Sequence, residues 1–139
     1  MYLVPTQESM RAMMDRPPGP FSMLNLYRLH EVADYSANPE FAPPNPISGR
    51  DLFDRYAASM DSLLASFDAK RVFLAEGAGC LIGPPDERWD VVQIVRYPSL
   101  SAFLSLTSSD EMLADMPHRL AMFEDSRVIP LIERTSESA

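Results

Sequence analysis

The chain has 139 residues, of which 46% are hydrophobic and 23% are charged, as expected for one globular domain with a single core. Its formal net charge of −8 argues against nucleic acid or an anionic membrane as a partner, because both select clustered lysine and arginine. The one cysteine, Cys80, excludes an intramolecular disulfide, and neither a signal-peptide pattern nor a membrane-spanning apolar run is present. We therefore expect a soluble, cytoplasmic protein.

The first twenty residues form a predicted N-terminal helical arm. Thr6 opens a helical pattern over residues 6–16, in which methionines recur at helical spacing, and the PPGP that follows ends it. Residues 21–134 are expected to form one domain, and residues 135–139 a frayed tail.

The domain begins with a predicted strand and a long loop. Residues 21–29 alternate in a strand pattern with apolar side chains on both faces. Residues 30–46 contain four prolines and no sustained period, so they form a predicted insertion loop that is longer than most connections. The length is compatible with a plain insertion, with a lid or with an arm that binds a partner.

A helix and two consecutive strands follow the loop. Ser48 starts a helix that should extend to about residue 67 with one apolar stripe: Phe53, Tyr56, Met60, Leu63, Leu64 and Phe67. A strand over residues 71–83 is expected to bulge at its glycines, and another follows over residues 89–97. The side chains beside Cys80 are apolar, which predicts a buried, inert thiol.

The last predicted elements are a broken helix and an edge strand. Ser99 caps a helix, Ser108 starts its second piece, and this piece should reach about residue 124. Residues 126–134 follow as a strand, and Pro130 within it favours a sheet edge. The resulting β-α-β-β-α-β order predicts an α+β, ferredoxin-like fold, a four-stranded antiparallel sheet with both helices on one face.

The alternation of the strands divides their side chains between two faces. We place Leu24, Leu26, Val92 and Ile94 beneath the helices. The open face then carries Met23, Val95 and a polar and aromatic set: Asn25, Tyr27, Trp89, Gln93 and Tyr97. Such a face needs a cover, and a second copy of the sheet is the simplest one, so we expect a homodimer.

Two motifs resemble a known family. The segments WDVVQIVRYPSLSAF and HRLAMFEDSRVIPL are similar to the family catalogued as domain of unknown function thirteen-thirty, within the dimeric α/β-barrel superfamily. The resemblance covers about residues 21–132 and implies the ferredoxin-like fold and a dimer. It implies no activity, because the family has none that is settled. Some members of the wider superfamily hold haem through a helix histidine, and here only His118 could serve.

The candidate site residues follow from the open face and from the titratable side chains. A small molecule on this face would be positioned by Asn25, Tyr27, Gln93 and Tyr97, and Trp89 would form one wall of the pocket.

His118 and Asp125 are candidates for moving a proton, with His118 structural in the alternative interpretation. Arg96 could bind a carboxylate substrate or pair with Asp125 or Glu124. The arginines with less support for these roles are Arg28, Arg55 and Arg119.

Two functions remain open. One is a homodimer that binds a small, partly aromatic or acidic metabolite on the open face, in one form as an enzyme that needs no cofactor. The other is a non-catalytic dimer in which the sheet face is only interface and the loop over residues 30–46 is a partner-binding arm. No metal site is expected, since no histidine or cysteine has ligand spacing.

Overall fold

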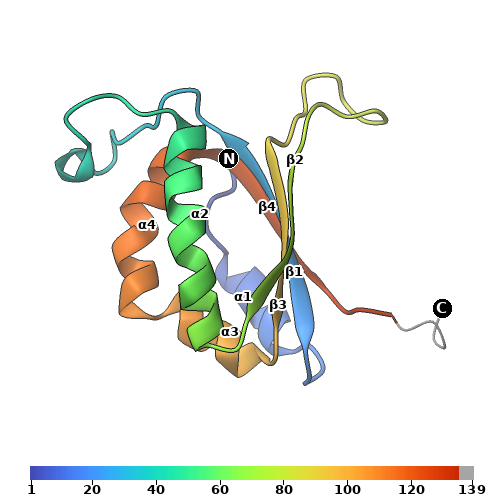
Figure 1. The fold of residues 1–139 in the computed structure, drawn as a ribbon. Coiled ribbons are helices and arrows are strands. Elements are labelled where there is room, and N and C mark those ends of the chain that lie inside the picture. The colour runs from blue at the N-terminus through green and yellow to red at the C-terminus, as the bar shows by residue number, and fades with distance from the viewer. Residues whose placement is uncertain (135–139) are drawn as a thin grey trace.

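The computed structural model describes residues 1–134, and the frayed tail expected at 135–139 lies outside them. Four antiparallel strands form one sheet in the order β2-β3-β1-β4, with all the helices on one side of it (Figure 1). This is the predicted ferredoxin-like arrangement. The strands are β1 (Phe21–Leu29), β2 (Lys70–Glu76), β3 (Val91–Tyr97) and β4 (Phe123–Leu131). The helices are α1 (Gln7–Met14), η1 (Pro39–Phe41), α2 (Gly49–Ser66), α3 (Leu100–Thr107) and α4 (Asp110–Met122).

Hydroxyl side chains begin the helices where the sequence predicts caps. Thr6, Ser48 and Ser99 each accept a hydrogen bond from a backbone N–H of the first helical turn. The start of α4 differs by one residue, because Ser109 accepts from Met112 N. Ser108, which was expected to cap α4, instead donates to Leu104 O and closes α3.

The expected bulge in the second strand lies at a different place. The pairing of β2 with β3 shifts between Arg71 and Phe73, and β2 ends at Glu76. Residues 77–89 then form a protruding hairpin, named here the hairpin arm, with a bridge between Gly79 and Arg88. A Cβ atom at Gly77 would collide with the Trp89 carbonyl oxygen, so the base of the arm requires glycine.

The predicted face assignment of the strands is wrong. The side chains at odd positions of β1 and β3 are buried under the helices, whereas Leu24, Leu26, Val92 and Ile94 lie on the open face and stay partly exposed. The polar tips of Tyr27 and Asn25 have hydrogen-bond partners beneath the helices, because Tyr27 OH donates to Asn25 Oδ1 and the Asn25 amide donates to Met23 O. Aromatic bulk fills the space between the layers, where the Tyr27 and Phe123 rings stack with centroids 4.0 Å apart.

The long loop over residues 30–46 is bound to its own domain. His30 N and Asp34 N donate to the last carbonyls of α4, those of Met122 and Ala121, and Ala33 N donates to Ile47 O. Gly49 packs so closely on the His30 backbone that no side chain fits there. These contacts hold the loop against the C-terminal end of α4.

Over residues 1–134, none of the helices combines the length and hydropathy needed to cross a membrane.

Candidate functional site

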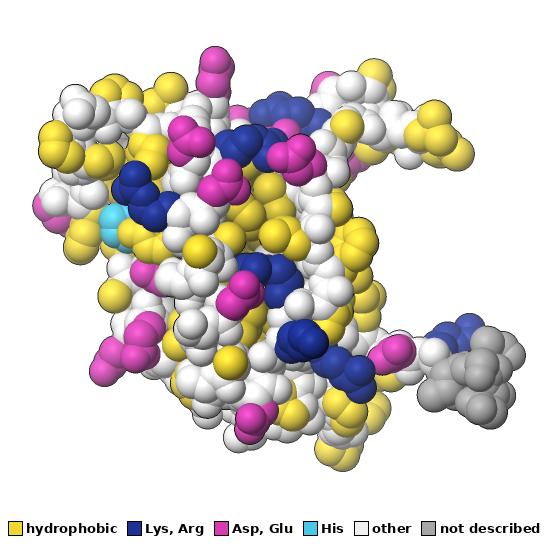
Figure 2. All heavy atoms as spheres, viewed as in Figure 1, with side chains coloured by type: hydrophobic (Ala, Val, Ile, Leu, Met, Phe, Trp, Pro, Cys, Tyr) yellow, Lys and Arg dark blue, Asp and Glu magenta, His cyan; other side chains and the backbone are white. Residues whose placement is uncertain are grey.

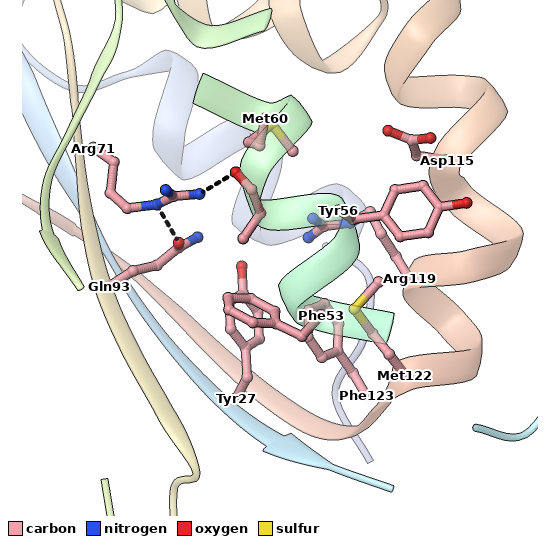
Figure 3. A pocket seen from close by; sticks show the side chains of 11 residues that line it. Tyr27, Phe53, Tyr56, Met60, Arg71, Gln93, Asp115, Arg119, Met122 and Phe123 are labelled. Carbon is pink, nitrogen blue, oxygen red and sulfur yellow. Dashed lines mark hydrogen bonds between the residues drawn. The ribbon is translucent and has the colours of Figure 1, made fainter. Parts of the chain in front are cut away.

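A small cavity lies between the helices and the sheet, on the side opposite the predicted open-face pocket (Figure 3). Its volume is about 30 Å³, enough for a water molecule, and it is partly open to solvent. Helices α2 and α4 provide one wall, and strands β1, β2 and β3 with the start of β4 provide the other. The lining side chains are Tyr27, Phe53, Tyr56, Ala57, Met60, Arg71, Gln93, Asp115, Arg119, Met122 and Phe123.

Arg71 is the fully paired arginine of this cavity. Its Nε donates to Gln93 Oε1 at 3.1 Å, and its two terminal nitrogens donate to Ala57 O and to Asp61 Oδ1. These bonds join β2 to β3 and to α2. Arg71 is therefore a positioning group that orients the Gln93 amide (Figure 3).

Arg119 is the cavity arginine without a polar partner. It lies on the cavity side of α4, and its guanidinium carbon is 5.3 Å from the centroid of the Phe123 ring. Among residues 1–134 its guanidinium makes neither an ion pair nor a hydrogen bond. The five N–H donors of the guanidinium are thus available to an acceptor in the cavity.

Two of the predicted binding residues line the cavity, and a third, Asn25, contacts one of them. Tyr27 and Gln93 are lining residues, and Asn25 holds the Tyr27 hydroxyl. Gln93 Nε2 has no hydrogen-bond partner within the described part of the chain. Tyr97 lies farther along β3, stacked on Phe21, and burial followed by the proximity of Tyr27 raises the pKa of its phenol far above the ordinary range.

The structure separates Trp89, Arg96 and Asp125 from the cavity. The Trp89 ring lies under the Arg127 guanidinium, 5.1 Å away, at the base of the hairpin arm. Arg96 is exposed on the open face, and its nearest carboxylate is Glu133 at 3.6 Å. The expected pairing of Arg96 with Asp125 or Glu124 is wrong, because Arg28 occupies that place, 2.8 Å from Glu124.

Asp125 is a buried carboxylate in a structural network. Burial would raise its pKa, but hydrogen bonds from Tyr2 N, Arg127 Nη1 and Ser126 N outweigh this and hold the pKa below the ordinary value. The Ser126 hydroxyl donates to the Tyr2 carbonyl. This network binds the N-terminal segment along β4.

His118 lies behind the cavity wall in an aromatic cluster. Its Nδ1 is 2.7 Å from the Tyr35 hydroxyl, its ring stacks on Tyr56 at 5.0 Å, and the Phe41 ring meets its edge. Burial, followed by the negative charge of Asp115, raises the pKa of the Tyr56 phenol. His118 therefore anchors the long loop to α4 and does not line the cavity.

A larger hollow of about 400 Å³ lies within the long loop itself. Its walls are mostly prolines and small residues, and the lining includes no charged side chain. With no charge to orient a ligand, it is a weaker candidate site than the cavity.

Most of the cavity residues were absent from the predicted site. Phe53, Tyr56 and Met60 belong to the apolar stripe of the helix predicted from Ser48 to about residue 67. Such a stripe indicates core residues and not a binding site. Arg71 carried no signal beyond its position in a strand. Arg119 was a minor candidate, and its distance of four residues from Asp115 is the pattern that places both on one side of a helix.

Among residues 1–134, no three histidine, cysteine, aspartate or glutamate side chains gather so that they could hold a metal ion.

Comparison with solved structures finds similarity over nearly the whole chain. A Rhodopseudomonas palustris protein of unknown function is 31% identical, with a TM-score of 0.81 and coverage of 96% of this chain and 98% of that one. The methylated form of the same protein gives 30% identity, a TM-score of 0.83 and coverage of 97% and 96%.

A Mesorhizobium loti protein, described as a dabb family protein with a ferredoxin-like fold, is 10% identical, with a TM-score of 0.49 and coverage of 84% of this chain and 99% of that one. No family model and no curated protein matches the chain.

Proposed function

We propose that this chain, which belongs to the same family as the Rhodopseudomonas palustris protein of unknown function, is a homodimeric α/β-barrel protein. We further propose that it binds a small carboxylate with an aromatic or apolar body. The ligand enters the cavity between α2, α4 and the sheet. The unpaired guanidinium of Arg119 is the observation that carries the proposal. The resemblance to the family of domain of unknown function thirteen-thirty agrees with the dimer and adds no activity.

Besides the acid Asp115, the cavity has two groups with free N–H donors, and these donors favour a ligand that carries acceptors. Arg119 offers free N–H donors, and Gln93 Nε2 offers two more. Tyr27 OH already donates to Asn25, so its oxygen accepts. A carboxylate is the acceptor that a guanidinium matches best, with two parallel hydrogen bonds.

The apolar lining suits the body of such a ligand. Phe53, Phe123 and the Tyr27 ring form an aromatic wall, with Phe53 6.3 Å from Tyr27 and 6.5 Å from Phe123 between centroids. Met60 and Met122 complete the lining. Methionine adapts its shape readily, so these side chains suit a flat or branched apolar group.

Binding requires that the cavity widen. A volume of about 30 Å³ is far below the roughly 300 Å³ or more of typical ligand pockets. Met60 and Arg119 have long, unbranched side chains. Within residues 1–134, no hydrogen bond fixes the end of either side chain. We expect both to change rotamer when the ligand enters, with the backbone largely unchanged.

The proposal is one of binding and assigns no reaction. His118 and Asp125, the predicted proton carriers, lie outside the cavity lining, and Asp115 is the acid within it. The long loop packs on α4 of its own chain, which favours a lid or structural role over an arm.

The open face of the sheet supports the dimer. Leu24, Leu26, Val92 and Ile94 form an aliphatic surface across β1 and β3, with Phe73 and Ile129 half exposed on the flanking strands. An exposed apolar sheet face of this extent is usually buried against another protein surface. A second copy packed face to face would provide it with two-fold symmetry.

Matched pairs of small molecules test the ligand class. We expect benzoate and phenylacetate to raise the melting temperature and to bind in calorimetry, whereas benzamide and phenylacetamide, which lack the charge, do not. Arg119→Gln should weaken carboxylate binding at least about tenfold, since a charge-assisted bidentate contact is lost. Arg119→Lys should retain part of the affinity.

The control is Arg55→Gln, because Arg55 is an exposed arginine of α2 that does not line the cavity. It should leave binding unchanged. The proposal fails if no carboxylate of the panel binds, or if Arg119→Gln binds as the unchanged protein does.

A further inference from the structure

The hairpin arm carries the two most exposed large hydrophobic side chains of the described residues. Leu81 is 99% exposed and Ile82 is 94% exposed, at the tip of the arm. Cys80, predicted to be a buried thiol, is exposed beside them. Figure 2 shows the hydrophobic tip standing clear of the rest of the molecule.

The arm is an ordered hairpin with a firm base. Gly77 N donates to Asp90 O, Trp89 N donates to Ala78 O, and Gly79 bridges to Arg88. Nearer the tip, Glu87 N donates to Pro84 O, and the Cys80 sulfur lies 3.7 Å from Glu87 O. These contacts hold the two sides of the arm together below its tip, and a bound loop of this kind has a lower entropic cost of docking.

The base is joined to the sheet at the end from which the arm leaves. The Asp90 carboxylate accepts from Leu29 N at 2.8 Å. Arg127 lies between the Trp89 and Tyr2 rings, 5.1 and 4.7 Å from their centroids. These contacts hold the base of the arm to β1 and β4.

The direction of the arm indicates which surface its tip contacts. The arm leaves the sheet on the side away from the helices, so it extends past the plane of the open face (Figure 1). A body that covers the aliphatic open face lies next to the arm. We propose that the arm of each subunit grips the flank of a second copy of this chain and buries Leu81 and Ile82 there.

This inference rests on the proposed dimer and adds a clamp to it. Two-fold symmetry places one arm at each end of the sheet pair, so four aliphatic side chains are buried per dimer. A membrane is the weaker alternative, because Asp86 and Glu87 lie in the arm and the chain carries a net charge of −8.

The first test uses the single cysteine of the unchanged protein. The rate at which a thiol reagent modifies Cys80 should fall as protein concentration rises through the dimer dissociation constant, because the tip becomes covered. A rate that does not depend on concentration across that range overturns the clamp.

The second test removes the apolar tip. The double variant Leu81→Ser/Ile82→Ser should keep its melting temperature under monomeric conditions, since both side chains are exposed there. Sedimentation should show a dimer dissociation constant raised at least about tenfold. The control is Leu113→Ser, an exposed leucine of α4 at 57%, which should leave the dissociation constant unchanged.

The outcomes separate the clamp from the dimer. If the unchanged protein dimerises and the double variant does so equally well, the clamp is wrong and the dimer stands. If the unchanged protein is a monomer at all concentrations, both are wrong. If the double variant binds anionic vesicles less than the unchanged protein and dimerises as well, the arm docks on membranes.

Discussion

The helix-facing side of the sheet carries tyrosine, asparagine and glutamine among its apolar groups, whereas the open face carries leucine, isoleucine and valine. On the buried side Asn25 and Gln93 have 7% and 8% exposure, and each makes a side-chain hydrogen bond within its own layer. On the open side Leu24 and Leu26 stay partly exposed. In β1 and β3, the buried side chains are thus the large ones and those with hydrogen-bond partners, and not the most hydrophobic ones.

The difference has a physical cause in the space between the layers. Helices packed on a sheet leave room for long side chains, and the Tyr27, Phe53 and Phe123 rings fill it. Aliphatic side chains on the open face instead give a flatter surface that suits a second sheet. The buried face thus holds the candidate ligand site, and the open face holds the proposed interface.

The largest expected effect tests which face is the core of one subunit. Phe123→Ala removes the ring stacked on Tyr27 and should lower the free energy of unfolding by about 3 to 5 kcal/mol. Ile129→Ala on the same strand is the matched open-face change, and at 43% exposure Ile129 should contribute about 1 kcal/mol or less. Chemical denaturation at a protein concentration that keeps the chain monomeric measures both. Equal losses would contradict the division between the faces.

The next effect tests the open face as an interface. Leu26→Asp places a charge at the centre of the aliphatic surface and should raise the dimer dissociation constant at least about a hundredfold, because a buried unpaired charge is costly. Light scattering after size-exclusion chromatography measures it. Leu113→Asp, on the helix layer, is the control and should remain dimeric. A Leu26→Asp dimer as stable as the unchanged one would place the interface elsewhere.

The element order and the helix starts could be predicted from the sequence to within one residue, but the strand bounds and the face of each strand could not. The predicted strand over residues 71–83 ends at Glu76, and the one predicted over 126–134 spans Phe123–Leu131. Helix caps such as Ser48 and Ser99 act within one turn, so local sequence determines them. Alternation separates the side chains of β1 into two sets without stating which set meets the helices. Polar Asn25 and Gln93 suggested the open face, because their partners, Tyr27 and Arg71, become evident only in three dimensions.

The cavity was harder to predict than the fold for the same reason. Arg71 and Arg119 come from β2 and α4, 48 positions apart in the chain, and no local pattern joins them. Residues 77–83 of the hairpin arm were predicted to continue the second strand beyond a bulge, yet β2 ends at Glu76 and these residues leave the sheet. The exposed Leu81 and Ile82 are therefore the opposite of what hydropathy predicts.

The smallest effect concerns the edge of the sheet at β4, where the N-terminal segment binds through Tyr2. Asp125 shares the open face with Leu26, but the N-terminal segment buries it through Tyr2 N. Because its pKa is lowered in the folded state, the carboxylate stabilises the fold above its unfolded pKa, and this stabilisation is lost as pH falls through the folded pKa. Asp125→Asn should lower stability at pH 7 by about 1 to 2 kcal/mol and should reduce the loss of stability that occurs as pH falls below the ordinary carboxyl range. Urea denaturation at several pH values measures this, with the exposed Asp54→Asn as control. If the two variants share one pH profile, the N-terminal segment is not held by the charge of Asp125.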